Sequence, residues 1–182
     1  MRMRERVGTA ERKTKTMPSP NSPVYEMRLL AMPEAELIAS WAATPEEVWA
    51  LAASEDFPLS ADQVAAWTYE ADFAFTLRRD GDLAAYAEVV EDSVEQDVEI
   101  QHLLVAPDLR AAGVGRAFLS RLCAFLAASR PYPEVWLRVG RDNVPAAACA
   151  LAAGFEDAAA LSGPRYRWLR KSLSPEGIAP AL

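Results

Sequence analysis

A glycine-bearing loop between an apolar run and a helix-like run is the first stretch of this sequence that could hold a ligand. The loop is Arg-Ala-Ala-Gly-Val-Gly at residues 110–115, and it follows the apolar residues 103–105. The first N–H groups of a helix lack partners within the helix and carry partial positive charge, so they favour phosphate. Glycine at 113 and 115 allows close approach to a ligand and turns that a Cβ would forbid. The loop predicts a phosphate-bearing ligand, with a plain strand-to-helix turn as the alternative.

Two common nucleotide-binding loops do not fit these residues. A P-loop ends in Gly-Lys-Ser/Thr, whereas Gly115 is followed by Arg116 and Ala117. A dinucleotide fingerprint needs a third glycine where Phe118 stands, and it belongs to the first strand–helix unit of its domain. Several elements precede the loop here, so the dinucleotide fingerprint is not matched.

The sequence around the loop resembles the GNAT superfamily of N-acetyltransferases. Residues 98–126 read VEIQHLLVAPDLRAAGVGRAFLSRLCAFL. The family pattern is a strand, Val-x-Pro, the hexad Q/R-x-x-G-x-G/A and an amphipathic helix. Arg110, Gly113 and Gly115 fill the fixed positions of the hexad, and residues 105–107 match the lead-in.

A second family element lies downstream of the loop. Asn143 and the pair Gly154-Phe155 follow a predicted strand in the order that the family shows around its short helix. The resemblance is specific over residues 98–155 and looser over residues 25–173. It implies a mixed, mostly antiparallel central sheet with helices on both faces.

The resemblance also implies acetyl-CoA as co-substrate and assigns residues to it. Backbone N–H groups of the loop would hold the pyrophosphate, and the main chain of the preceding strand would pair with the pantetheine arm. The implied cofactor-binding residues are Leu103, Leu104, Val105, Arg110, Ala111, Ala112, Gly113, Val114, Gly115, Arg116 and Asn143. Arg110 and Arg116 could add positive charge or could be solvated or structural arginines. Asn143 could also be a helix N-cap.

Glu99, at the start of that strand, is the predicted general base. A glutamate placed there is the base in some histone-modifying members of the superfamily. Side chains alternate between the two faces of a strand. One face of this strand should carry Glu99, Gln101, Leu103 and Val105, and the opposite face should carry His102. A glutamate on a central strand is costly to bury without a partner or a role. Glu88 on the preceding strand is an alternative base, and His102, with a reference pKa near neutrality, is another.

The general acid that would protonate the departing thiolate has no counterpart at the position where the family carries it. Many family members carry a tyrosine four residues before the Gly of Gly-Phe, and here that position is Ala150, which has no proton to donate. Tyr166 on the last predicted strand is the candidate acid in its place. Water could also suffice, because a thiolate with a reference pKa of about 8.5 is a good leaving group.

Charge and composition limit the classes of partner that the protein is expected to bind. The 182-residue chain has net charge −7; residues 1–22 carry +4, so the remainder carries −11. An acidic body argues against nucleic acid and agrees with a cationic ligand such as an amine, although acidic surfaces also serve solubility. The single histidine argues against a metal site of the usual multi-histidine kind.

The cysteines and the apolar runs bear on the compartment. Cys123 and Cys149 have no Cys-x-x-Cys partners, so reduced thiols and a cytoplasmic location fit better than a disulfide framework. No apolar run approaches the roughly 20 residues that cross a bilayer, so no membrane partner is expected.

The elements that must position these residues follow from periodicity and caps. We expect strands over residues 24–31, 97–105, 133–140 and 165–173, and a hairpin over residues 72–92 turning at Asp80-Gly81. We expect two short helices within residues 33–53, the second starting at Thr44-Pro45, and further helices over residues 60–71, 114–130 and 142–154. The order β-α-α-α-β-β-β-α-β-α-β predicts an α/β domain, α+β in some schemes. It spans residues 23–173, between a basic tail (1–22) and a loose C-terminal tail (174–182).

Three hypotheses follow. The first is an N-acetyltransferase that moves an acetyl group from acetyl-CoA to a primary amine, on a small molecule or peptide, by direct attack in a ternary complex. The second is a non-catalytic acyl-CoA-binding or regulatory module, because Ala150 replaces the expected acid. The third is a different nucleotide binder. Four aromatic residues could line the acceptor pocket or form core: Trp41, Trp49, Phe57 and Trp67. The sequence leaves open which amine is the acceptor and whether the protein is a homodimer.

Overall fold

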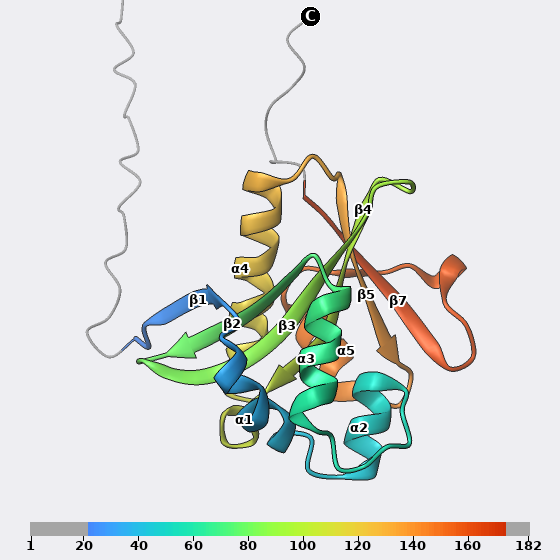
Figure 1. Ribbon diagram of the computed structural model, residues 1–182. Helices are drawn as coiled ribbons and strands as arrows, with labels where there is room; N and C mark the ends of the chain where they lie inside the picture. The colour runs from blue at the N-terminus through green and yellow to red at the C-terminus, as the bar shows by residue number, and fades with distance from the viewer. Residues whose placement is uncertain (1–21, 174–182) are drawn as a thin grey trace, which may run out of the picture.

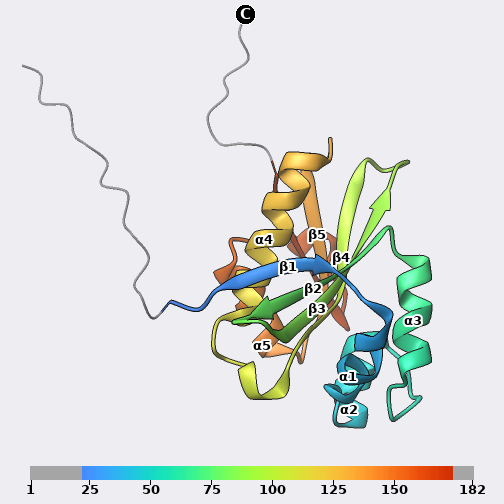
Figure 2. The same ribbon diagram turned by 60° about the vertical axis from the view of Figure 1, so that its left-hand side comes forward.

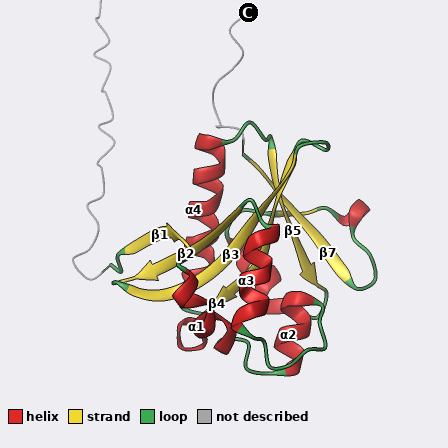
Figure 3. Ribbon diagram, viewed as in Figure 1, coloured by secondary structure: helices red, strands yellow, loops and turns green. Residues whose placement is uncertain are grey.

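The computed structural model describes residues 22–173, which form one sheet with helices on both of its faces (Figures 1 and 3). The strands are β1 Tyr25–Leu29, β2 Phe73–Arg79, β3 Asp82–Asp92, β4 Asp97–Val105, β5 Glu134–Gly140, β6 Glu156–Asp157 and β7 Tyr166–Ser172. The α-helices are α1 Ala35–Ser40, α2 Pro45–Ala52, α3 Ala61–Glu70, α4 Val114–Ser129 and α5 Val144–Ala152. Three single-turn 3₁₀ helices are η1 Met32–Glu34, η2 Pro107–Leu109 and η3 Ala159–Leu161. The predicted C-terminal tail, and residues 1–21 of the predicted N-terminal tail, lie outside the described residues.

The sheet is mixed and mostly antiparallel. Its strand order is β1-β2-β3-β4-β5-β7-β6, and β4–β5 is its parallel pair. The predicted architecture is therefore confirmed. The sequence did not predict β6, a two-residue strand that pairs with β7 after α5 has ended.

The parallel pair is short, and the two strands part beyond it. Only residues 98–100 of β4 pair with β5, opposite residues 135–137. The later part of β4 pairs on its other side with β3. Figure 1 shows β4 and β5 diverging towards their carboxyl ends. We call the divergence of the two strands beyond residue 100 the wedge; residues 103–105 lie on its β4 side.

Two apolar cores hold the helices against the sheet. On one face α4 and α5 pack against the strands, with Leu119, Leu122 and Leu126 of α4 fully buried. On the other face α1, α2 and α3 bury Ile38 and Val48, among others, against side chains of β2, β3 and β4. Figure 2 shows the two groups of helices on opposite sides of the sheet. Among residues 22–173, no helix is both long enough and apolar enough to cross a membrane.

A β-bulge interrupts β4 at His102. Glu88 of β3 is opposite Gln101, but Tyr86 is opposite Leu104, so three steps along β4 span two along β3. His102 has a φ of 47°, in the left-handed region that non-glycine residues seldom adopt. The extra residue reverses the alternation of side chains beyond it.

The bulge makes the predicted facing of β4 wrong. Val98 and Ile100 lie in the α4–α5 core, so Glu99 points to the other face. Beyond the bulge Leu103 and Val105 pack against the α4–α5 core, on the side away from Glu99. His102 lies on the side of α1–α3, with Glu99 rather than opposite to it. The prediction from side-chain alternation fails here because alternation assumes a strand without a bulge, and β4 carries one extra residue at this point.

Local signals account for several element boundaries. Thr44 accepts a hydrogen bond from the Glu47 N–H (3.2 Å) and caps α2, and Ser60 caps α3 in the same way through Gln63. The predicted hairpin between β2 and β3 forms, and its turn residue Gly81 has a φ of 97°.

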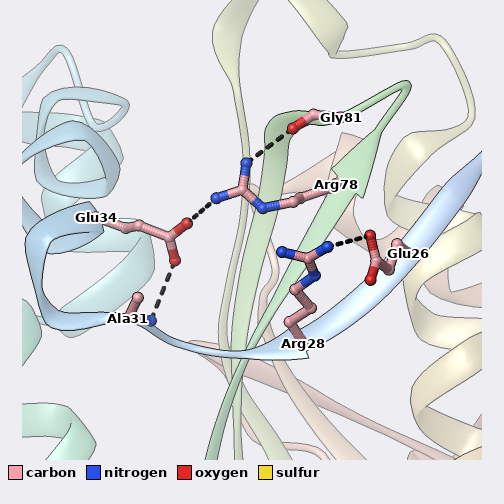
Figure 4. A network of polar contacts seen from close by, with 6 residues as sticks. All are labelled: Glu26, Arg28, Ala31, Glu34, Arg78 and Gly81. Carbon is pink, nitrogen blue, oxygen red and sulfur yellow. Dashed lines mark hydrogen bonds and ion pairs between the residues drawn. The ribbon is translucent and has the colours of Figure 1, made fainter.

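The start of the helical segment is tied to that hairpin. Arg78 of β2 donates to the Gly81 carbonyl (2.8 Å) and pairs with Glu34 of η1 (Figure 4). The other oxygen of Glu34 accepts from the Ala31 N–H (3.2 Å). These contacts fix the position at which the chain leaves β1 and enters α1.

Candidate active site

The predicted cofactor loop presents a set of unpartnered backbone donors. Ala111 and Gly113 have positive φ angles of 60° and 79°, which turn the chain from η2 into α4. Within residues 22–173, no hydrogen-bond acceptor is present for the N–H groups of Ala111, Gly113, Val114, Gly115 and Arg116. Adjacent free N–H groups at a helix start form an anion-binding site. A Cβ at Gly113 would meet no atom within 4 Å, so that position faces open space.

The second glycine of the loop has a different environment. A Cβ on Gly115 would lie 2.8 Å from the Cys149 Sγ of α5 and 3.5 Å from Val105 Cγ2. Real Cβ atoms essentially never approach within 3 Å of another heavy atom. Gly115 therefore allows the start of α4 to pack directly on α5, whatever ligand the loop binds.

The side chain of Arg110 contacts the helices on the other side of the sheet. Its guanidinium donates to the Trp41 carbonyl (2.7 Å), pairs with Glu47, and approaches the Val105 carbonyl (3.3 Å). Partial burial disfavours the charged form of Glu47, but hydrogen bonds from Arg110 and from the Ala43 N–H outweigh it and lower its pKa. The loop is thereby fastened to α2.

Arg116 differs from Arg110 in its surroundings. It is exposed on the first turn of α4, and its side chain has no hydrogen-bond or ion-pair partner within the described part of the chain. Of the two arginines predicted to supply charge, Arg116 is the one whose guanidinium is available to an anion at the loop.

The short helix α5 contributes two of the predicted positions. Asn143 caps it, since its Oδ1 accepts from the Ala146 N–H (3.1 Å). Ala150 is 1% exposed, and its carbonyl accepts from the Phe155 N–H (3.1 Å). The N-cap interpretation of Asn143 is therefore confirmed. At the position where the family resemblance implies a tyrosine, this chain has the buried methyl group of Ala150.

The predicted base and acid share one face of the sheet. Glu99 is in register with Trp136 of β5, and Arg138 of β5 is in register with Trp168 of β7. Tyr166 begins β7 two residues before Trp168, and the Arg138 guanidinium lies 5.2 Å from its ring centroid. This is the face away from α4 and α5.

Glu99 is partly buried on that face. Burial raises the pKa of its carboxyl group, while a hydrogen bond from Gln101 Nε2 (3.1 Å) and the positive charge of Arg138 act in the opposite direction. The net effect is a raised pKa.

The two alternative bases, Glu88 and His102, are hydrogen-bonded to one another. Glu88, 1% exposed, lies 2.7 Å from His102 through Oε2 and Nδ1, and it also accepts a hydrogen bond from the Tyr86 hydroxyl. The imidazole stacks on the Trp67 ring of α3, with centroids 4.0 Å apart and planes 14° apart. Burial and the nearby charge of Glu88 raise the pKa of Tyr86 well above its ordinary value. Sequence reasoning missed this pairing, because it placed His102 on the wrong face.

Comparisons with known proteins show the family of this chain. Residues 33–155 match the acetyltransferase (GNAT) family. This chain belongs to the GNAT acetyltransferase family. A curated relative, the streptothricin acetyltransferase of Streptomyces lavendulae, is 40% identical over 67 residues, which are 37% of this chain and 35% of that relative. The chain thus spans about a third of the length of that relative.

Solved structures of N-acetyltransferases share the fold. The spermidine N-acetyltransferase of Vibrio cholerae, in complex with CoA and spermine, is 15% identical, with 82% of this chain and 95% of that chain covered and a TM-score of 0.67. The ribosomal-protein-S18-alanine N-acetyltransferase of Escherichia coli is 23% identical, with 87% and 100% covered and a TM-score of 0.63.

The four aromatic residues considered for the acceptor pocket of this GNAT protein divide into two groups. Trp41 is buried in the core under α1–α3, and Trp67 is partly buried against the same core. Trp49 and Phe57 are 47% and 44% exposed. Of these four residues, Trp67 is the one whose ring stacks on the His102 imidazole.

Proposed function

We propose that this GNAT protein transfers the acetyl group of acetyl-CoA to a primary amine by direct attack within a ternary complex. The observation that carries the proposal is the row of five unpartnered N–H groups at residues 111 and 113–116, next to the wedge between β4 and β5. The donors suit a pyrophosphate, and the wedge exposes a strand edge to which an extended amide-bearing arm can pair.

The residues present fit the pyrophosphate and the pantetheine arm of CoA. The free N–H groups and the exposed Arg116 would hold the pyrophosphate. β5 leaves this part of β4 unpaired, so the main chain of Leu103, Leu104 and Val105 would bond the amides of the pantetheine arm. The Val105 carbonyl would share this role with its hydrogen bond from Arg110 Nε (3.3 Å). Asn143 has its Oδ1 engaged in capping, so its amide group is the part available to the arm.

The reaction joins the amine nitrogen to the thioester carbonyl carbon and breaks the carbon–sulfur bond, with the electron pair leaving on sulfur. An ammonium group must lose a proton before it can attack, so a base is needed near the thioester. We call the face of the sheet away from α4 and α5 the acceptor face. Three of the ionisable groups on it are candidates for proton transfer: Glu99, His102 and Tyr166. The thiolate takes its proton from Tyr166 or from water.

The acceptor class rests on charge and on relatives. The body of the chain is acidic, with net charge −11 outside residues 1–22. The relatives are named for acetylating streptothricin, spermidine and a ribosomal-protein alanine. These features support an amine acceptor, on either a small molecule or a peptide.

A non-catalytic acyl-CoA-binding module is the second candidate. Ala150 favours it, because a buried methyl group stands where the family resemblance implies a proton donor. Under this reading CoA binds at the loop, but no amine is acetylated.

Two measurements separate the candidates. Isothermal titration with acetyl-CoA, CoA and NAD should show binding of both CoA species and none of NAD. A thiol-release assay over a panel of polyamines, aminoglycosides and peptides with free N-termini should then show turnover with at least one amine. CoA binding without thiol release across the panel would favour the second candidate, and no binding of either CoA species would contradict both.

A further inference from the structure

Resting on the proposed function, we propose that His102 removes the proton from the attacking amine and that Glu88 is the residue that positions it. The two side chains form a buried carboxylate–imidazole pair, on the acceptor face and at the point where β4 leaves β5. The pair lies outside the cofactor loop, so the cofactor can bind without it.

With Glu88 as an ionised carboxylate, the contact between the two residues sets the protonation pattern of the imidazole. Glu88 Oε2 lies 2.7 Å from His102 Nδ1. An ionised carboxylate only accepts hydrogen bonds, so Nδ1 must carry the hydrogen and the lone pair of the neutral ring resides on Nε2. The same arrangement orients the histidine of a serine-protease triad.

The carboxyl group of Glu88 is buried and hydrogen-bonded on both of its oxygens. The side chain of Glu88 is 2% exposed, and its two oxygens accept hydrogen bonds from His102 and from the Tyr86 hydroxyl. A buried charge is tolerated when it is paired and hydrogen-bonded in this way. Its negative charge would stabilise the imidazolium that forms when His102 takes a proton.

The free edge of the imidazole remains reachable. The side chain of His102 is 17% exposed, and within residues 22–173 its Nε2 has no hydrogen-bond partner. Stacking on Trp67 at 4.0 Å covers one face of the ring and limits its rotation. The pair and the stack together leave Nε2 as the open position.

The backbone at His102 supports a functional reading. Its φ of 47° is a strained conformation for a residue with a Cβ, and such conformations cluster at functional sites. The bulge turns the side chain out of the strand alternation and towards α3. Ile100, two residues earlier, is the last residue of β4 that pairs with β5.

Few other charged or titratable groups surround the imidazole. From β3, Glu88 contacts it directly and Tyr86 acts through Glu88. From β4, the charge of Glu99 interacts with it, and Glu99 in turn interacts with Arg138 of β5. From α3 the contact is the uncharged Trp67. With His102 as base, Glu99 is left to attract the cationic acceptor.

The test uses the pH dependence of kcat/KM for the best amine of the panel. The variant His102→Asn keeps a residue type that tolerates positive φ and removes the proton acceptor. We expect kcat/KM to fall by about 100-fold or more, with acetyl-CoA affinity within about 2-fold and with the acidic limb of the pH profile lost. His102→Gly should regain activity on addition of imidazole, which a purely structural role would not produce.

The single histidine of the chain allows a direct check on the titrating group. With ¹³C-labelled histidine, one imidazole signal should titrate with the same midpoint as the acidic limb. Glu88→Gln can still accept from Nδ1–H through its amide oxygen and donate to the Tyr86 oxygen, so it should fold. Loss of its charge should move both midpoints to lower pH, because the imidazolium loses its stabilising partner.

Glu99→Gln is the matched control, since Glu99 is the base predicted from the sequence. It should keep the acidic limb. Loss of the limb in Glu99→Gln together with its retention in His102→Asn would overturn the proposal while leaving the proposed function intact. A wild-type protein that acetylates no amine of the panel would instead contradict the proposed function, and this inference with it.

Discussion

A Cβ placed on Gly115 would stand 2.8 Å from the Sγ of Cys149, so the first turn of α4 rests on α5 as closely as a glycine permits. The same turn supplies three of the five free N–H groups of the cofactor loop. Helix packing and the proposed cofactor site therefore share this residue.

The first prediction separates the two roles. Gly115→Ala should lower the free energy of unfolding by about 1–3 kcal/mol through overpacking, despite the better helix propensity of alanine. Cys149→Ala removes the clashing sulfur, and the double variant should recover most of the loss. Urea unfolding of the four proteins gives the coupling energy. A Gly115→Ala protein as stable as the wild type would show that α5 moves away at no cost.

Gly113 is required for its backbone conformation rather than for space. Its φ is 79°, and a Cβ there would meet nothing within 4 Å. Gly113→Val should abolish acetyl-CoA binding, because a β-branched residue drives the loop out of the left-handed region and redirects its N–H groups. Gly113→Asn, which tolerates positive φ, should retain most of the affinity in isothermal titration. Equal affinity of the valine variant and the wild type would contradict the pyrophosphate role.

Much of the fold follows from short-range signals. The caps at Thr44 and Ser60 and the turn at Asp80-Gly81 act within a few residues, and each forms where the sequence predicts it. The apolar face of α4, which includes Leu119, Leu122 and Leu126, is likewise a local feature, because residues three and four apart share a helix face.

The arrangement of the site depends on contacts that no local pattern contains. The bulge at His102 becomes visible only when β3 and β4 are paired, and it decides which face carries the imidazole. The Arg110–Glu47 pair joins residues 63 positions apart. Sequence periodicity carries no information on either contact, so the Glu88–His102 pair could not be predicted.

The Arg110–Glu47 pair leads to a test of what the arginine does. If its side chain serves to hold α2 to the loop, then Arg110→Met and Glu47→Gln should weaken acetyl-CoA binding equally, each by less than about 3-fold. Both variants should lose at most about 1 kcal/mol of stability, because the pair is partly exposed. A much larger loss of affinity in Arg110→Met than in Glu47→Gln would show instead that the guanidinium contacts the pyrophosphate.

The raised pKa of Glu99 predicts how stability depends on pH. Burial makes the folded protein hold this proton to a higher pH than the unfolded chain does. The contribution of Glu99 to stability is therefore fully present below the unfolded pKa of about 4.5 and is lost as pH rises through the folded pKa. Glu99→Gln carries no charge, so it should match the wild type near pH 4 and exceed its stability at pH 7.5.

Glu26 offers a control of opposite sign. The hydrogen bond from Arg28 lowers the pKa of this exposed carboxyl, so its contribution is present above the unfolded pKa and is lost as pH falls. Glu26→Gln should therefore be no more stable than the wild type at pH 7.5 and should match it at low pH. Urea unfolding at the two pH values measures both variants. A Glu99→Gln protein less stable than the wild type at pH 7.5 would mean that the Gln101 and Arg138 interactions outweigh the burial of Glu99.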